Sequence, residues 1–199
     1  TVVCPWCYIG KRRLEQALAG HPGPARITHR AFQLDPTATS DGRPTVEILA
    51  RKYGVSPEQA SAMMANVSAA AEAVGLEYRL EQTLSGNTRN AHRLILWAQE
   101  QGAAQPLLES LYAGYFTEGL PVFTIDELLP FAGAVGLDTD QAQAMLAGDA
   151  YGPEVQQDQE LAASLGATGV PFFVFNRTYG ISGAQPLEVF QQTLAQASA

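Results

Sequence analysis

Apolar positions recur at helical spacing over most of this chain, and glycine or proline interrupts the pattern between segments. Between about Pro44 and Gly166 the pattern predicts seven helices, over residues 44–53, 57–74, 87–101, 104–117, 124–135, 138–147 and 153–165. Ser56-Pro57-Glu58 and Thr124-Ile125-Asp126-Glu127 are typical of helix starts, because their side chains can cap free backbone N–H groups. The middle of the chain is therefore predicted to be helical throughout.

The first residues carry a different pattern, in which short apolar runs flank a single helix. Val2-Val3 is predicted to end a buried strand that brings Cys4 to the surface. A helix is predicted to begin at Pro5, since proline suits the first helical turn, where its missing N–H costs nothing. A second strand is predicted near residues 27–32. This part therefore has the order strand, helix, strand.

The end of the chain is predicted to form a hairpin followed by a helix. Residues 172–175 and 179–182 are short strand patterns separated by a turn at Asn176-Arg177. Pro186 then opens a terminal helix, with Leu187 and Phe190 on one face. A hairpin followed by a helix is the back half of a thioredoxin fold, and the strand–helix–strand unit supplies its front half.

We therefore predict an α/β protein, a thioredoxin fold with a large all-helical insertion domain. Residues 1–43 and 167–199 would form the thioredoxin-like domain, with its first strand truncated because only three residues precede Cys4. Residues 44–166 would form the insertion, and its last helix would bridge back to the thioredoxin part.

Charge and hydropathy limit the kinds of partner that this protein could bind. The net charge is −8 and the isoelectric point is near 4.8. Nucleic acids and anionic membrane surfaces are bound through clustered Lys and Arg, so this acidic composition argues against both. The one basic run, Lys11-Arg12-Arg13, is interpreted as a solvated helix face. No apolar run approaches the roughly 18 residues of a membrane helix. Neither a nucleic acid nor a membrane is expected as a partner.

Cys4 and Cys7 are the two cysteines of the chain and lie three positions apart. They could be a redox pair, half of a metal site, or two inert buried residues. A structural zinc needs about four ligands. The chain offers three histidines besides, at positions 21, 29 and 92, and no two of them lie three to five residues apart. No metal site is therefore expected.

The predicted helix start favours redox chemistry over an inert pair. Cys4 would lie at the positive end of the helix, where free N–H groups stabilise a thiolate and lower the thiol pKa. Cys7, one turn later, falls on the apolar face of the helix. This asymmetry suits a dithiol catalyst, in which Cys4 attacks to form a mixed disulfide and Cys7 resolves it.

Several stretches of the sequence resemble one family. The motifs are VVCPWCYIGKRRLE at the start, AFQLDP at 31–36, NTRNAHRLILWA at 87–98, and GVPFFVF and ISGAQP near the end. Together they resemble the DsbA-like branch of the thioredoxin superfamily, and most closely its FrnE-like group, which is related to 2-hydroxychromene-2-carboxylate isomerases and occurs in polyketide biosynthesis. One departure is Thr1, where relatives commonly carry Asp.

The resemblance implies roles for the residues around the cysteines. Pro171 would be cis and face Cys4, and the backbone of Val170, beside Gly169, would pair with an extended substrate. Pro5 and Trp6 would tune the site. Because Trp6 carries no charge, thiolate stabilisation would come mainly from the helix end. We therefore expect a reduction potential less oxidising than the DsbA extreme of about −120 mV.

His92 lies in one of the resembling motifs and is a second kind of candidate. Its apolar neighbours on a predicted helix favour a hydrogen-bonded packing role over that of a catalytic base. The resemblance implies in addition that His92 forms part of the wall of the substrate cleft.

Three functions fit this pattern. The first is a thiol–disulfide oxidoreductase acting on a protein or peptide thiol or disulfide, with the Cys4–Cys7 disulfide as its redox group and no other cofactor. The second is a glutathione-dependent isomerase or transferase on a small aromatic or polyketide substrate, against which the retained Cys7 counts. The third is a binding module with a static cysteine clip. The resemblance favours the cytoplasm, and the truncated front end leaves export open. An apolar cleft could also serve as a homodimer surface.

Overall fold

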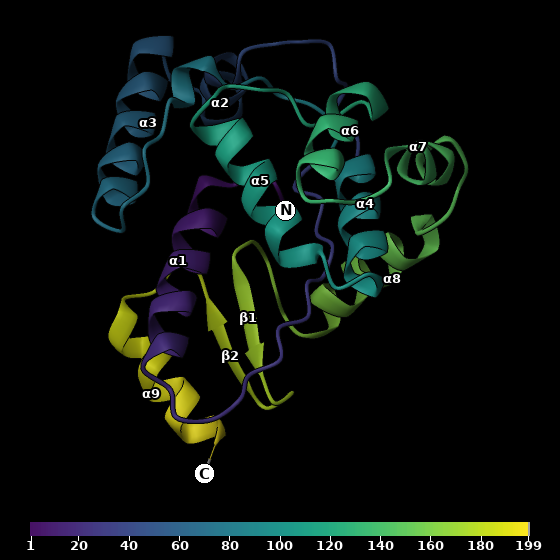
Figure 1. Cartoon of the computed structure of the whole chain (residues 1–199). Coiled ribbons are helices and arrows are strands. Elements are labelled where there is room, and N and C mark those ends of the chain that lie inside the picture. Colours follow the sequence, from purple (N-terminus) through teal and green to yellow (C-terminus); the bar gives the residue numbers. More distant parts are fainter. Residues whose placement is uncertain (199) are drawn as a thin grey trace.

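The computed structural model describes residues 1–198 and is mostly helical (Figure 1). Its elements are, in order, α1 (Pro5–Ala19), α2 (Thr45–Tyr53), α3 (Pro57–Glu72), the short 3₁₀ helix η1 (Leu80–Gln82), α4 (Arg89–Glu100), α5 (Ala104–Phe116), α6 (Ile125–Ala134), α7 (Thr139–Ala147), α8 (Gly152–Ser164), β1 (Phe172–Phe175), β2 (Tyr179–Ser182) and α9 (Leu187–Ala197). Each of the seven helices predicted between 44 and 166 is present, with ends that differ from the prediction by at most two residues.

Local capping explains why two of these helices begin where they do. Ser56 accepts a hydrogen bond from the Gln59 N–H, and the Gln59 side chain accepts one from the Ser56 N–H. Thr124 and Glu127 make the same reciprocal pair at the start of α6. Each pair satisfies backbone donors that the first helical turn leaves free. The predicted starts of α3 and α6 are confirmed.

The hairpin packs against the first and last helices of the chain. β1 and β2 are antiparallel, with Phe172 opposite Ser182 and Phe175 opposite Tyr179. Figure 1 shows α1 and α9 lying together beside this sheet. Their shared core centres on four buried side chains, Ala17, Ile181, Phe190 and Leu194. The hairpin and the terminal helix were both predicted, and they hold α1 in place.

Two predicted strands do not form in the described chain. Residues 1–3 and residues 27–32 have no strand pairing there, and the sheet described has two strands. The backbone of the second segment bonds to helix side chains instead. The His29 N–H donates to Gln99 of α4, and the Ala31 N–H donates to Asp158 of α8. With these donors satisfied, the segment runs extended along the helices without joining a sheet.

The larger core lies among the helices. Buried apolar side chains of α1, α3, α4, α5, α6 and α7 form one continuous cluster, which also includes Cys4 and Cys7. α8 contacts the segment at 30–33 through Asp158 and Gln159. The division into two domains at 43/44 and 166/167 stays a prediction. No helix among residues 1–198 has both the length and the apolar character needed to span a bilayer.

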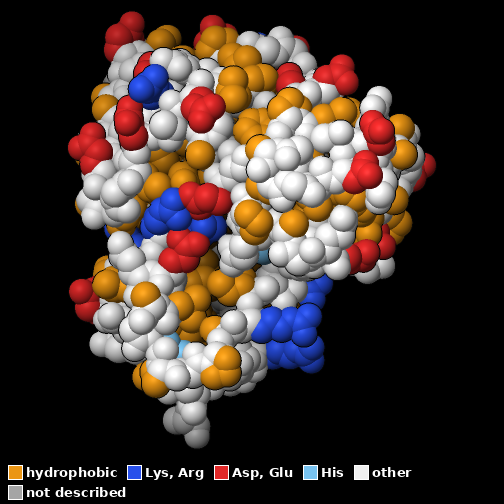
Figure 2. All heavy atoms as spheres, viewed as in Figure 1, with side chains coloured by type: hydrophobic (Ala, Val, Ile, Leu, Met, Phe, Trp, Pro, Cys, Tyr) orange, Lys and Arg blue, Asp and Glu red, His pale blue; other side chains and the backbone are white. Residues whose placement is uncertain are grey.

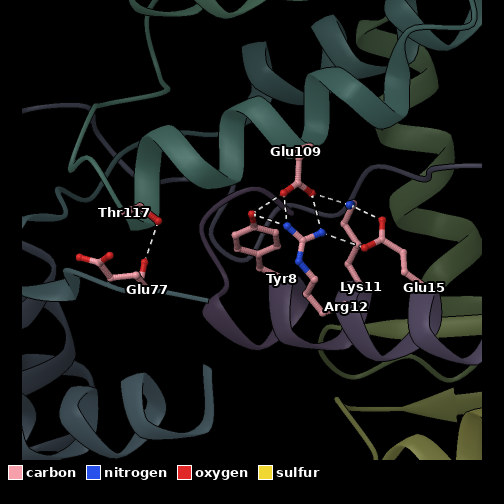
Figure 3. Close-up of polar contacts among 7 residues, drawn as sticks. All are labelled: Tyr8, Lys11, Arg12, Glu15, Glu77, Glu109 and Thr117. Atoms are coloured by element: carbon pink, nitrogen blue, oxygen red, sulfur yellow. Dashed lines mark hydrogen bonds and ion pairs between the residues drawn. The ribbon is translucent and has the colours of Figure 1, made fainter. Parts of the chain in front are cut away.

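A cluster of charged and polar side chains joins α1 to α5 (Figure 3). The Glu109 carboxylate of α5 accepts hydrogen bonds from Tyr8, Lys11 and Arg12 of α1, and Glu15 pairs with both basic residues. Lys11 is only 9% exposed, so the prediction of a solvated basic face is wrong for this residue. Figure 2 shows positive and negative side chains gathered over this part of the surface, and acidic side chains scattered over the helical part of the same face.

Because of the Glu109 cluster, the free energy of unfolding should depend on pH in the acid range. Burial opposes ionisation of Glu109, but hydrogen bonds from Arg12, Lys11 and Tyr8 lower its pKa from 4.5 to about 2. Because the pKa is lower in the folded chain, the stabilisation is complete above pH 4.5 and is lost as the pH falls from 4.5 toward 2. Glu109→Gln should therefore lower the melting temperature at pH 7 by about 3 °C, the shift for roughly 1 kcal/mol in a chain of this size.

The difference between Glu109→Gln and wild type should shrink between pH 4.5 and 2 in the same thermal scans. Glu77→Gln is the matched control, because the Glu77 side chain is 69% exposed and pairs only at the surface with Arg79. A Glu109→Gln difference that stays constant down to pH 2 would contradict the assignment.

Candidate active site

Cys4 is the N-cap residue of α1, and Pro5 is the first residue of the helix. The Cys4 backbone is extended, with φ −97° and ψ 113°, and its carbonyl accepts the Cys7 N–H at 2.9 Å. Pro5 fits the first turn because its missing N–H would have no partner there. The chain therefore turns sharply into α1 at Cys4 and places Cys7 one turn further on, with both thiols free.

The loop at Val170–Pro171 faces this helix start. The Val170–Pro171 peptide bond is cis, as the resemblance implied, and the Cys4 sulfur lies 3.6 Å from the Val170 carbonyl oxygen. Gly10 permits this approach. A Cβ at Gly10 would lie 3.0 Å from Phe173 Cζ and 3.1 Å from Pro171 Cγ, closer than most Cβ contacts in proteins. The loop and the motif are thus in direct contact, through the Cys4 sulfur at Val170 and through the Pro171 and Phe173 side chains at Gly10.

Cys4 is less exposed than the sequence suggested. Both Cys4 and Cys7 are 7% exposed, so the prediction that Cys4 is brought to the surface is wrong. Cys4 belongs to the helical core, and Val170 packs against that core. The exposed member of the motif is Trp6, at 40%. At 7% exposure, the Cys4 side chain presents little open surface to a reacting partner.

The two thiols have opposite tendencies to ionise. A hydrogen bond from the Cys7 thiol, helped by the N–H groups of Cys7 and Trp6, lowers the pKa of Cys4 from 9.0 to about 7 despite burial. Burial and the hydrogen bond to Cys4 raise the pKa of Cys7 well above 9.0. The predicted asymmetry is present. Its largest cause is the Cys7 thiol, however, rather than the helix end that the sequence suggested.

A tyrosine outside the motif also contacts it. The Tyr78 hydroxyl donates to the Pro5 carbonyl oxygen at 2.7 Å, although the two residues are 73 positions apart. The sequence analysis did not identify Tyr78, since it lies in a short segment with no clear periodicity. A buried tyrosine finds a hydrogen-bond partner as a rule, but no sequence pattern indicates which one.

The structure buries His92 in the wall of a small cavity. His92 is 2% exposed and lines a small cavity of about 80 Å³ with Thr1, His29 and Tyr112, and its Nε2 atom lacks a hydrogen-bond partner. Burial lowers its pKa well below 6.5. A place for His92 in a substrate cleft stays a prediction, as does the role of Gly169. Residues 1–198 contain no group of three or more His, Cys, Asp or Glu that could hold a metal ion.

The unequal thiols predict selective alkylation. Near neutral pH, iodoacetamide should modify reduced Cys4 at least about tenfold faster than Cys7, because the thiolate is the reacting species. The Cys4 rate should rise with pH around a midpoint near 7. Fragment mass spectrometry of the peptide that carries both cysteines measures the two rates. Protein unfolded in urea is the control and should lose the selectivity, whereas equal rates in the folded protein would contradict the asymmetry.

Comparison with known proteins places this geometry in a family. The family model for the DSBA-like thioredoxin domain matches residues 1–195. The crystal structure of a probable DsbA oxidoreductase from Streptomyces coelicolor is 46% identical, covers 99% of this chain and 86% of its own, and superposes with a TM-score of 0.94. A candidate protein disulfide isomerase from Nitrosomonas europaea is 15% identical, covers 98% of this chain and 92% of its own, and superposes with a TM-score of 0.67, which bears on the fold alone.

A further relative, the uncharacterised protein YwbO of Bacillus subtilis, is 24% identical over 97% of this chain and 92% of its own length. The predicted α/β class, a thioredoxin fold carrying a large helical insertion, is confirmed by the family model and by the Streptomyces coelicolor structure. This chain belongs to the family of DSBA-like thioredoxin domains.

Proposed function

We propose that this protein is a thiol–disulfide oxidoreductase in which Cys4 is the attacking thiol and Cys7 the resolving one. One observation carries the proposal. Two thiols of opposite tendency to ionise share one helical turn, and the more acidic sulfur lies 3.6 Å from the carbonyl oxygen of the loop residue Val170. Membership of the family and the name of the Streptomyces coelicolor relative support the same activity.

The reaction transfers two electrons in two exchanges. The Cys4 thiolate attacks one sulfur of a substrate disulfide, the S–S bond breaks, and the departing substrate thiolate takes a proton. The resulting mixed disulfide joins Cys4 to the substrate. The Cys7 thiol then loses its proton and attacks the Cys4 sulfur, forming the Cys4–Cys7 disulfide and releasing the second substrate thiol. The substrate is reduced, and a dithiol or two monothiols restore the enzyme; the reverse sequence oxidises a dithiol substrate.

The substrate proposed is an extended peptide or protein segment. Its backbone would pair with that of Val170, as in strand addition, and so carry its sulfur to Cys4. The exposed Trp6 ring would cover an apolar side chain beside that sulfur. The FrnE-like assignment, a polyketide pathway, a homodimer and a cytoplasmic location stay predictions.

The test compares single cysteine variants. Wild type should catalyse reduction of insulin disulfides by dithiothreitol, and Cys4→Ala should fall to the uncatalysed rate because it removes the attacking sulfur. Cys7→Ala should accumulate a mixed disulfide with insulin, visible by mass and reversed by reductant, since no second thiol resolves it. A Cys4→Ala variant that keeps the activity, or a Cys7→Ala variant that turns over like wild type, would contradict the assignment of roles.

The same variants separate the glutathione-dependent alternative. An isomerase or transferase that uses glutathione would not need Cys7 as a resolving thiol. Wild-type protein without effect on insulin, combined with tight glutathione binding that Cys7→Ala leaves unchanged, would favour that function.

A further inference from the structure

The segment that carries Tyr78 is fixed to the end of α5 on both sides of this residue. The Thr117 hydroxyl donates to the Glu77 carbonyl oxygen at 2.7 Å, as Figure 3 shows, and the Arg79 N–H donates to the Phe116 carbonyl oxygen at 2.7 Å. Because both flanking peptides are held, the direction in which the Tyr78 side chain leaves the backbone is restricted.

The ring of Tyr78 is held as firmly as its backbone. It is 9% exposed and packs against two neighbouring rings, those of Phe116, at a centroid distance of 5.0 Å, and Tyr8, at 6.2 Å. Tyr8 in turn is fixed by the Glu109 cluster. The ring therefore has one position available, and in that position its hydroxyl reaches the motif.

The hydroxyl binds one end of a peptide in the first turn of α1, the helix whose N-cap residue is Cys4. Tyr78 donates to the Pro5 carbonyl oxygen, and the N–H of the same peptide belongs to Trp6, one of the groups that stabilise the Cys4 thiolate. A carbonyl oxygen has two lone pairs, so it can accept this bond in addition to a helical one. Hydrogen bonds in a chain polarise one another, so a donor on the C=O makes the N–H of that peptide a better donor.

We propose that Tyr78 is a positioning residue of the dithiol site, whose hydroxyl orients and polarises the Pro5–Trp6 peptide so that its N–H stabilises the Cys4 thiolate. Tyr78 acts without touching the reacting sulfurs. Burial raises the pKa of Tyr78 far above its ordinary value, so its hydroxyl remains a donor over the working pH range. The proposal rests on the proposed function only in naming Cys4 as the attacking thiol.

Other ionisable groups face the cysteines and bear on the measurement. Cys7 lies on α1, and Tyr112 reaches the pair from α5. Burial raises the pKa of Tyr112 well above 10.0, so this tyrosine stays neutral. Below about pH 9, changes in the Cys4 titration thus report on Cys4, Cys7 and the peptide groups around them.

The test is a thiolate titration of the reduced protein, followed by absorbance at 240 nm. Tyr78→Phe keeps the ring and removes the hydroxyl, and it should move the curve to higher pH, so that the thiolate fraction at pH 6 falls about threefold. In a glutathione redox buffer above about pH 8, where Cys4 is mostly thiolate, the equilibrium should move close to threefold toward the oxidised protein, because the reduced form has lost a stabilised thiolate, and the shift should be smaller at pH 7.

Tyr115→Phe is the matched control. Tyr115 is also buried, also contacts Phe116, and donates its hydroxyl to a backbone carbonyl at 2.6 Å, but that carbonyl belongs to Leu84 outside the motif. Thermal scans of both variants separate loss of stability from loss of thiolate. Tyr115→Phe should destabilise the protein and leave the titration unchanged, and an unchanged titration in Tyr78→Phe would overturn the proposal.

The same comparison in a Cys7→Ala protein removes the influence of Cys7. The same shift should appear when Cys7→Ala is compared with Cys7→Ala/Tyr78→Phe, where Cys4 is the only thiol, and its absence there would also overturn the proposal. Since the titration requires no turnover, a shift in a protein without activity on insulin would leave the role of Tyr78 intact and reject the proposed function instead.

Discussion

The close approach of α1 to the Val170–Pro171 loop is the contact on which the rest of the site depends. Gly10 makes it possible, because any side chain there would meet Pro171 and Phe173 within about 3 Å. The hairpin behind the loop and α9 hold the same face of α1 through a common apolar core. With the helix and loop in contact, the Cys4 sulfur and the Val170 carbonyl fall within 3.6 Å without any bridging side chain.

Cys4 lies in an apolar core, and the groups that bear on its ionisation are mostly uncharged. The groups that stabilise its thiolate are the Cys7 thiol and peptide N–H groups, and burial raises the pKa values of Tyr78 and Tyr112, so both tyrosines stay neutral. The strongly charged residues of α1 are engaged by Glu109 instead. The parts of this helix therefore differ in their surroundings, since its first turn carries the cysteine motif while its second and third turns anchor it to α5.

Short-range patterns predicted the helices, the hairpin and the helix start at Cys4 and Pro5, because each depends on neighbouring residues. Capping at Ser56 and Thr124 and the apolar spacing of α1 are visible in the chain itself. The predictions failed where contacts between residues far apart in the sequence determine the local structure. Residues 27–32 have strand-like composition, but side chains of α4 and α8 take their backbone hydrogen bonds. The burial of Cys4 and the bond from Tyr78 to Pro5 likewise require the folded arrangement of helices far apart in sequence.

α5 contacts both α1 and the segment that carries Tyr78. Through Glu109 it holds α1, and through Phe116 and Thr117 it holds the segment that reaches the Cys4–Cys7 motif. The helical insertion therefore could not be exchanged between relatives without affecting the Cys4–Cys7 motif. Grafting it between relatives would have to carry α5 and residues 77–79 together, whereas α6 and α7, which pack chiefly on each other and on α4 and α5, are free to diverge in length and surface.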